Sequence, residues 1–225
     1  MNGKFKLACV LFDLDGTLVD TAPDLVACLN RAIGKHGYPS FEVEQIRAYI
    51  SYGAAAMIAW ATKGAGEDLQ KQMLTDMLND YQNNLVAHSR FFAGMPEALS
   101  FIENQGLKWG VVTNKRERFT LPLMTALKLT ERAACIVSGD TTANSKPHPE
   151  PMLAACRQAN VKPENCVYIG DAAHDITAGK CANMKTLAAL YGYLKNDDQP
   201  DAWGADGLIS SPEQLTSWIQ SSACY

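Results

Sequence analysis

Short apolar runs of strand length recur along the chain. The first, residues 7–12, is continuously apolar rather than alternating, which is typical of a parallel strand buried on both faces of a sheet. Similar runs follow at Trp109–Val112, Cys135–Val137, Cys166–Ile169 and Thr186–Leu190, with a weaker one at Gly207–Ile209. The pattern therefore predicts a sheet of buried, parallel strands.

Helical segments are predicted between these runs. They cover Met95–Gln105, Pro149–Asn160, Ala173–Asn183 and Pro212–Ile219. Gly106 directly follows the first of them, as is typical of a helix C-terminus. Strands that alternate with helices at this spacing form βαβ units, so we expect an α/β fold, a Rossmann-like, doubly wound parallel sheet with helices on both faces.

The alternation stops between Pro23 and Ser89, where no strand is predicted. A helix is expected to begin after Asp20 or Thr21. Leu, Met and Tyr recur at every fourth residue over 69–85, which predicts a long helix with one apolar face, and ordinary packing is enough to explain that face. The predicted organisation is a core of residues 1–16 and 92–225 with an inserted α-helical domain, residues 17–91.

Composition restricts the class of protein. Of the 225 residues, 47% are hydrophobic and 20% are charged, which is ordinary for a globular protein. A net charge of −4 without a basic run argues against a nucleic-acid partner. No apolar stretch reaches the ~20 residues of a membrane-spanning helix, and residues 7–12 are too short for a signal peptide, so no membrane partner is expected. Seven cysteines without a C-x-x-C pair are expected to be free thiols in a reducing cytoplasm.

Two acidic residues, Asp13 and Asp15, directly follow the first apolar run. In extended backbone, residues two apart point the same way, so both carboxylates are expected to face one spot beyond the carboxyl end of the strand. Open α/β sheets bind ligands at that edge. A turn built on Asp15-Gly16 is an alternative explanation of the same residues.

Two more acidic residues, Asp171 and Asp175, follow the run at Cys166–Ile169. Helix capping explains one of them but not both together with the earlier pair. Carboxylates that converge without a Lys or Arg between them need a cation to offset their repulsion. Mg²⁺ is the expected ion because it takes a few carboxylate oxygens together with water and phosphate oxygens.

Polar groups also follow the next two strands. Thr113 and Asn114 come directly after one of them, where a hydroxyl and backbone N–H groups can hold phosphate oxygens, although a threonine also ends strands by propensity alone. Lys146 precedes Pro147, which favours extended backbone at the lysine. Its ammonium is therefore expected to reach across the same site as a point charge.

These residues, in order and spacing, resemble the four motifs of the haloacid dehalogenase-like phosphatase superfamily. The motif residues are Asp13-Leu14-Asp15-Gly16-Thr17, Thr113, Lys146, and Gly170-Asp171 with Asp175. The helical insert resembles the C1-type cap of that superfamily. Residues 10–25, 111–115 and 191–193 are similar to its phosphoglycolate phosphatase branch. Residues 49–56, 88–90, 94–97, 144–147 and 203–206 are more similar to members of that branch that act on N-acetylmuramic acid 6-phosphate.

The resemblance implies a mechanism. Asp13 would attack phosphorus to form an aspartyl-phosphate, and Asp15 would protonate the leaving oxygen and then activate water. Mg²⁺ would be bound by Asp13, Asp171, Asp175 and the backbone carbonyl of Asp15. The phosphate would be bound by Thr113, Asn114 and Lys146. His148 and His174 stand where the branch often has Asp and Arg, and the resemblance assigns them no role.

Three classes of function stay open. The first is a Mg²⁺-dependent phosphomonoesterase acting on a small phosphorylated metabolite, N-acetylmuramic acid 6-phosphate or phosphoglycolate. The others are a phosphosugar mutase and a non-catalytic phospho-receiver module, although receivers are shorter and lack the insert. Arg47, Tyr52 and Gly53 are expected substrate contacts, while an inter-helix turn without a ligand explains the last two equally well. A monomer or weak homodimer is expected.

Overall fold

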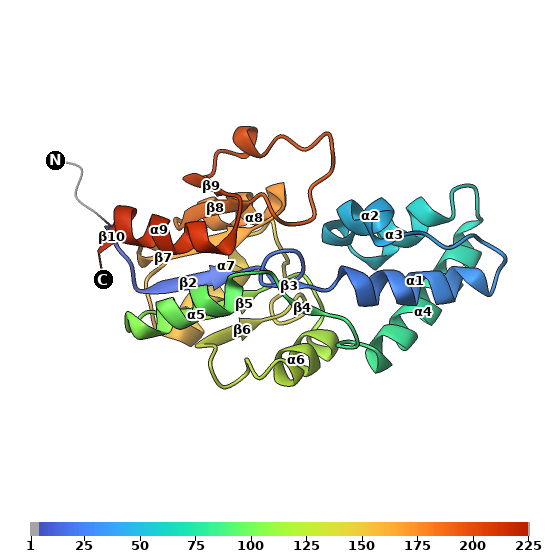
Figure 1. The fold of residues 1–225 in the computed structure, drawn as a ribbon, viewed down its shortest axis with the longest axis horizontal. Helices are drawn as coiled ribbons and strands as arrows, with labels where there is room; N and C mark the ends of the chain where they lie inside the picture. The colour runs from blue at the N-terminus through green and yellow to red at the C-terminus, as the bar shows by residue number, and fades with distance from the viewer. Residues whose placement is uncertain (1–4, 225) are drawn as a thin grey trace.

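The computed structural model describes residues 5–224, and its centre is a six-stranded parallel sheet with strand order β6-β5-β2-β7-β8-β9 (Figure 1). The strands are β2 (Cys9–Phe12), β5 (Lys108–Val112), β6 (Cys135–Val137), β7 (Cys166–Gly170), β8 (Lys185–Ala189) and β9 (Gly207–Ile209). Each overlaps one of the predicted apolar runs, so the predicted α/β sheet is confirmed. Residues 1–4 and 225, at the ends of the predicted core, lie outside the described residues.

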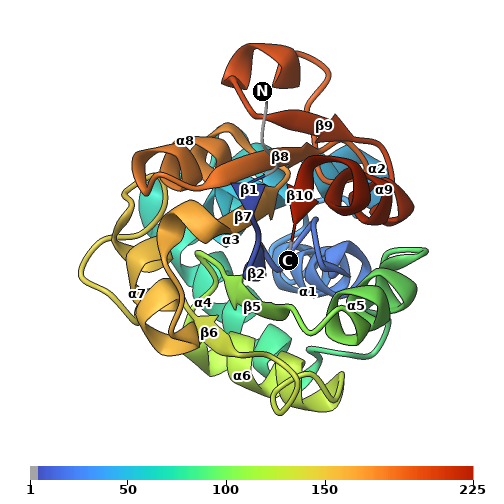
Figure 2. The same ribbon diagram turned by 90° about the vertical axis from the view of Figure 1, so that its left-hand side faces the viewer.

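Helices cover both faces of the sheet (Figure 2). Val10 and Phe12 of β2 pack against one set of helices, and Cys9 and Leu11 pack against the other. The first set is α5 (Met95–Asn104), α6 (Glu117–Ala126) and α9 (Pro212–Ser222), and the second is α7 (Glu150–Ala159) and α8 (Ala173–Cys181). Because every side chain of β2 is buried on one face or the other, its sequence does not alternate between apolar and polar residues.

Helix α6 was not predicted from the sequence. It contains Pro122 in its interior, and an internal proline is a strong signal against a helix. Its buried side chains Leu123 and Met124 join the same hydrophobic cluster as α5 and α9. Tertiary packing of this face therefore outweighs the unfavourable local signal.

A second group of helices lies together at the end of the molecule to the right in Figure 1. It comprises α1 (Ala22–Gly34), α2 (Val43–Ile46), the 3₁₀ helix η1 (Arg47–Tyr52), α3 (Ala54–Ala61) and α4 (Glu67–Asn83). These helices share a hydrophobic cluster of their own. Met73, Met77 and Tyr81 of the predicted stripe are buried in it, whereas Leu85 lies beyond the end of α4.

Two chain segments connect this helical group to the sheet, and they pair with each other. Strand β3 (Val19–Asp20) runs antiparallel to β4 (Arg90–Phe91). The buried carboxylate of Asp24 accepts hydrogen bonds from the N–H groups of His88 and Ser89 at 2.9 and 2.8 Å. The two connections are thus held together, although strands of two residues carry no recognisable sequence pattern.

The remaining elements are short. Strand β1 (Phe5–Lys6) pairs in parallel with β10 (Ala223–Cys224), and the 3₁₀ helices η2 (Pro163–Asn165) and η3 (Pro200–Trp203) lie in loops. No cysteine within residues 5–224 forms a disulfide. Across the same residues, no helix has both the length and the apolar character needed to span a bilayer.

Candidate active site

The carboxyl ends of the central strands lie at the same level. Phe12, the last residue of β2, is in register with Val111 of β5 and Ile169 of β7. The next residue, Asp13, continues the ladder by donating its N–H to Ile169 at 2.8 Å. This alignment brings three segments that are far apart in the sequence to one edge of the sheet, where open α/β sheets bind ligands.

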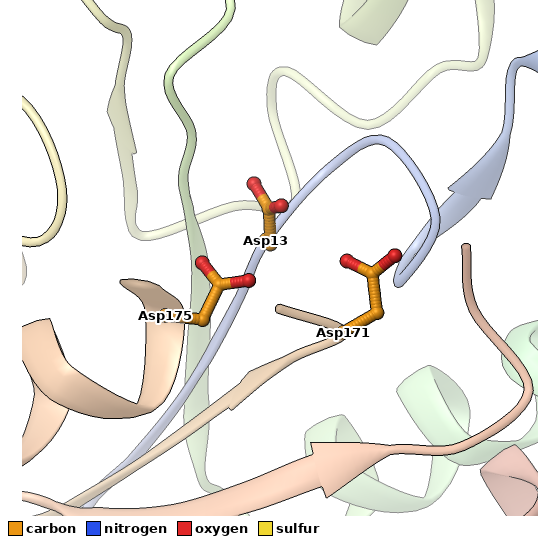
Figure 3. A group of neighbouring side chains, drawn as sticks. All are labelled: Asp13, Asp171 and Asp175. Atoms are coloured by element: carbon orange, nitrogen blue, oxygen red, sulfur yellow. The ribbon is translucent and has the colours of Figure 1, made fainter. Parts of the chain in front are cut away.

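Three buried carboxylates meet at this edge (Figure 3). Asp13 follows β2, Asp171 follows β7, and Asp175 lies in the first turn of α8. Each offers an oxygen atom, and these atoms lie within 4.8 Å of one another. Figure 3 shows the three side chains close together, with one oxygen of Asp171 and one of Asp175 turned toward each other.

Asp171 accepts three hydrogen bonds from distant parts of the chain. Its Oδ2 atom accepts hydrogen bonds from the N–H of Tyr193 at 2.7 Å and from the hydroxyl of Ser51 at 3.1 Å, and its Oδ1 atom accepts from Thr17 at 3.2 Å. Ser51 belongs to η1, so the helical group reaches the acidic cluster directly. None of these partners could be recognised from the sequence, because they come from three distant segments.

Glycines allow the backbone to approach these carboxylates closely. Gly16 adopts φ = +84°, and a Cβ atom built on it would overlap the carboxylate of Asp171. A Cβ on Gly170 would likewise overlap the side chain of Asp175. At both positions only glycine fits without displacing an acidic side chain.

A buried lysine lies between two of the acids. The Lys146 Nζ atom is 2.8 Å from Asp13 Oδ1 and 2.7 Å from Asp175 Oδ1, and it also donates a hydrogen bond to the hydroxyl of Tyr168 at 2.9 Å. The expectation that the acids converge without a basic group between them is therefore wrong. The lysine does reach this site from its loop, as expected from the sequence, but its pairing with two of the acids is seen only in the fold.

Asn114 holds that lysine in position. Its side-chain Oδ1 accepts a hydrogen bond from the backbone N–H of Lys146 at 3.0 Å, and its Nδ2 donates to the Lys146 carbonyl at 3.1 Å. The peptide bond between Lys146 and Pro147 is cis. Thr113, in contrast, turns its hydroxyl oxygen toward the N–H of Lys115 at 3.2 Å.

Burial and mutual repulsion control the protonation of the acidic cluster. Burial, followed by repulsion from Asp13 and Asp175, raises the pKa of Asp171 to about 8. Burial also raises the pKa of Asp13 to about 6, although the charge of Lys146 opposes the change. For Asp175 burial is again the largest single influence and acts in the same direction, but the charges of Lys146 and His174 and the hydrogen bonds from Lys146 and Tyr168 together outweigh it, so the pKa is lowered. Burial tends to lower the pKa of Lys146, yet its two acidic neighbours raise it overall.

The cluster has the properties of a divalent cation site. The three carboxylates and one ammonium leave two negative charges uncompensated when all four groups are ionised. In addition, the buried Asp13 Oδ1 atom contacts the lysine charge but has no directed hydrogen bond. Carboxylate oxygens are the ligands that Mg²⁺ prefers, so these residues fit that ion.

Asp15 makes a different set of contacts. Its carboxylate lies outside the group of three and accepts hydrogen bonds from Lys115 Nζ at 3.0 Å and from the Thr21 hydroxyl at 2.5 Å. Lys115 Nζ also donates to the hydroxyl of Tyr81 in α4 at 2.9 Å. Burial tends to lower the pKa of Lys115, but Asp15 and Tyr81 raise it overall. Sequence reasoning missed the pairing of Lys115 with Asp15, although both residues follow strand ends.

A cavity of about 340 Å³ opens onto this edge of the sheet. From the core it is lined by Asp13, Asp15, Thr113, Asn114, Lys115, Arg116, Phe119 and His174, and from the helical group by Leu25, Ile50, Ser51, Tyr52, Gly53, Ala54, Met57, Leu78 and Tyr81. The predicted contacts Tyr52 and Gly53 are thus part of its wall. Arg47 is not, because its guanidinium pairs with Asp20 at 3.0 Å.

The two histidines singled out by the sequence differ in position. His174 lines the cavity, with its Nε2 atom 3.9 Å from Asp175 Oδ1. Burial lowers its pKa, which favours the neutral ring. His148 lies outside the cavity, where its Nδ1 atom accepts a hydrogen bond from the N–H of Glu150 at 3.2 Å.

Comparison with known proteins gives consistent matches. The family model of haloacid dehalogenase-like hydrolases matches residues 10–189. The chain is 42% identical to an N-acetylmuramic acid 6-phosphate phosphatase of Pseudomonas putida over 97% of this chain and 99% of that protein. It is 39% identical to a phosphoglycolate phosphatase of Xanthomonas campestris over 94% and 97% of the two chains. The crystal structure of a predicted phosphoglycolate phosphatase from Haemophilus somnus superimposes with a TM-score of 0.85 at 27% identity, covering 97% of this chain and 99% of that one.

Proposed function

Because the chain belongs to the haloacid dehalogenase-like hydrolase family, we propose that it is a phosphomonoesterase that hydrolyses N-acetylmuramic acid 6-phosphate through an aspartyl-phosphate. The observation that carries the proposal is the placement of two acids with different environments on one cavity. Asp13 lies in the cluster of carboxylates with Lys146, whereas Asp15 lies beside Lys115. One acid can thus act as nucleophile while the other transfers protons.

Mg²⁺ is the proposed cofactor. Asp13, Asp171 and Asp175 supply the carboxylates that would bind it, and the backbone carbonyl of Asp15 remains a predicted fourth ligand. When bound, the ion would offset negative charge on the cluster and on the phosphoryl group. Thr17, Ser51 and the Tyr193 N–H fix the orientation of Asp171 through the hydrogen bonds described above.

The covalent steps follow from the positions of the two acids. An oxygen of Asp13 forms a bond to phosphorus while the bond from phosphorus to the sugar oxygen breaks, and Asp15 gives its proton to that leaving oxygen. Asp15 then takes a proton from water, whose oxygen attacks the phosphoryl group of the aspartyl-phosphate. Inorganic phosphate leaves, and Asp13 is regenerated.

Lys146 and Thr113 would bind the transferring phosphoryl group. Lys146 is buried and rigidly placed, so its charge needs no reorganisation when negative charge develops. The predicted phosphate contact Asn114 is proposed to act at least partly through Lys146, because its side chain pairs with both backbone groups of the lysine.

We propose that the helical group, residues 17–91, is a C1-type cap over the cavity. Leu25, Ile50, Met57 and Leu78 give it an apolar inner wall. A wall of this kind excludes water from the reacting groups when the cavity is closed. The contact of Tyr81 with Lys115 links the cap to the acid–base residue Asp15.

One alternative substrate and one alternative reaction are tested by the same experiment. Phosphoglycolate is the alternative substrate, since relatives 39% identical carry that name. A phosphosugar mutase is the alternative reaction and would need a bisphosphate activator. Cytoplasmic location and a monomer or weak homodimer remain predictions.

The experiment is phosphate release from a panel of phosphorylated metabolites, ranked by kcat/KM. It includes N-acetylmuramic acid 6-phosphate, phosphoglycolate and glucose 1-phosphate with and without glucose 1,6-bisphosphate. We expect the first compound to rank highest, with activity lost in EDTA and restored by Mg²⁺. Full activity of Asp13→Asn, or turnover only with the bisphosphate, would contradict the proposed function.

A further inference from the structure

One arginine of the cavity has no acidic partner. Arg116 lines the cavity and directly follows Lys115, at the position where α6 begins. Its guanidinium makes no ion pair or hydrogen bond with any group among residues 5–224. An exposed cation of this kind on a cavity wall is available to a ligand.

The other cations near the cavity are already neutralised by acids. Lys115 pairs with Asp15 at 3.0 Å, and Lys146 contacts Asp13 and Asp175. Arg47, outside the lining, pairs with Asp20. Within the described part of the chain, Arg116 is therefore the one lining cation whose charge is not offset by a carboxylate.

Different parts of the cavity lining also carry different kinds of side chain. The buried acids and Lys146 occupy the edge of the sheet, the apolar side chains Met57 and Leu78 line the cavity from the helical group, and Arg116 stands at the start of α6. A ligand that fits all three regions carries a phosphate, a carbon skeleton and a second anion. A guanidinium can form two parallel hydrogen bonds with a carboxylate or with a phosphate. Its single positive charge balances a carboxylate fully, whereas a second dianionic phosphate would keep one negative charge unbalanced.

We infer that Arg116 binds the carboxylate of a phosphorylated carboxylic acid and so makes the enzyme selective for substrates that carry one. The inference rests on the proposed function and deepens it, since both of its candidate substrates contain a carboxylate. In N-acetylmuramic acid 6-phosphate this group is on the lactyl ether, which N-acetylglucosamine 6-phosphate lacks. The two sugars therefore form a matched pair that differs in the lactyl group alone.

The test is the ratio of kcat/KM for the two sugar phosphates. The wild-type enzyme is expected to prefer the muramic compound by about 10- to 100-fold, the range of one charged hydrogen-bonded pair. Arg116→Gln should bring the ratio close to one, mainly through a higher KM for the muramic compound. Arg116→Lys should restore part of it, because the charge returns without the planar fork.

Arg118→Gln is the matched control. Arg118 is exposed, lies two residues further along α6 with its guanidinium 4.5 Å from the centre of the Phe119 ring, and does not line the cavity. This variant should keep the wild-type ratio. An unchanged ratio in Arg116→Gln, or a wild-type ratio near one, would overturn the inference, as would a bisphosphate sugar that ranks above both compounds.

The outcome also separates the inference from the proposed function. Equal hydrolysis of both sugars leaves the phosphatase in place and contradicts the role of Arg116. If the wild-type enzyme hydrolyses neither sugar, the proposed function is wrong, and calorimetric titration of Asp13→Asn with each sugar phosphate still decides about Arg116. Tighter binding of the muramic compound that is lost in the Asp13→Asn, Arg116→Gln double variant supports the inference, and equal binding contradicts it.

Discussion

The two walls of the cavity are built in different ways. The core wall carries charged groups held by partners, as with Asp13, which lies 2.8 Å from the Lys146 ammonium, and Asp15, which accepts hydrogen bonds from Lys115 and Thr21. The wall contributed by the proposed cap, called the cap wall below, is mostly apolar, and its Tyr52 residue is 49% exposed. Groups that perform chemistry need fixed orientation and charge, whereas groups that select a substrate need only shape and a few polar contacts. The core wall should therefore tolerate substitution far less than the cap wall.

The largest effect is expected from Asp13, the proposed nucleophile on the core wall. Asp13→Asn should lower kcat by about 10³-fold or more, because no aspartyl-phosphate can form. Its thermal stability should not fall, since the variant removes a buried carboxylate whose pKa burial has raised. Phosphate release and thermal unfolding measure the two properties. Asp197→Asn, an exposed acid outside the cavity, is the control, and comparable activity in the two variants would contradict the assignment.

The second prediction concerns the contribution of the buried charges beside the core wall to the stability of the protein. Lys146→Met leaves Asp13 and Asp175 facing each other without the ammonium, so the free energy of unfolding should fall by about 3–5 kcal/mol in metal-free buffer. Urea denaturation followed by circular dichroism measures it.

A surface pair provides the comparison for that measurement. Arg31 lies 2.6 Å from Asp80 but its side chain is 51% exposed, so Arg31→Gln should cost only about 0–1 kcal/mol. An equal loss of unfolding free energy in the two variants would show that the buried lysine contributes no more to stability than the exposed arginine.

The third prediction concerns the effect of pH on the proposed Mg²⁺ site. The pKa of Asp171 is about 8 in the folded chain, above the 3.8 of an ordinary aspartate. This group therefore favours folding fully below about pH 4, and its contribution is lost as the pH rises toward 8. A bound cation reverses the situation, because it requires the ionised carboxylate. The apparent Mg²⁺ affinity should fall by up to about tenfold per pH unit below 8.

Urea unfolding with EDTA or with Mg²⁺, at about pH 5.5 and pH 8.5, checks this expectation. The gain in unfolding free energy on adding Mg²⁺ should be larger at the higher pH. A gain that is equal at both pH values would indicate that no proton competes with the ion at these carboxylates.

The smallest effect is expected on the cap wall. Tyr52→Ala removes a half-exposed ring that lies 3.6 Å from Lys195 Nζ, so the unfolding free energy should change by no more than about 0.5 kcal/mol. The KM for the preferred substrate should rise by up to about tenfold while kcat stays within about twofold. Steady-state kinetics separates the two constants. A loss of kcat like that of Asp13→Asn would contradict the view that the core wall performs the chemistry and the cap wall only selects the substrate.

The sheet could be predicted from the sequence because its strands are buried on both faces and flanked by clear helical segments. The edge where Asp13 and Asp171 meet follows from that topology, since parallel strands end at one side. Helix α6 was missed because Pro122 outweighs its packing in any local reading. The pairs β3–β4 and β1–β10 were missed because two residues carry no periodic pattern.

The contacts within the site were less accessible to prediction than its location. The bond from Asn114 to Lys146 and the pairing of Lys115 with Asp15 join residues separated by 32 and 100 positions. Ser51 reaches Asp171 from the helical group across 120 positions. Motif spacing gives residue types at strand ends, whereas the partner of each side chain depends on how loops fold over that edge.

Tyr193 links two parts of the molecule through one residue. Its backbone N–H supports Asp171, and its hydroxyl accepts hydrogen bonds from the N–H groups of Thr21 and Ala22, where α1 begins, while donating to Asp20. A rotation of α1 away from the sheet must break these hydroxyl contacts or pull on the segment that carries the N–H. Any such rotation would therefore also act on the carboxylate of Asp171, because a single residue contacts both it and the start of α1.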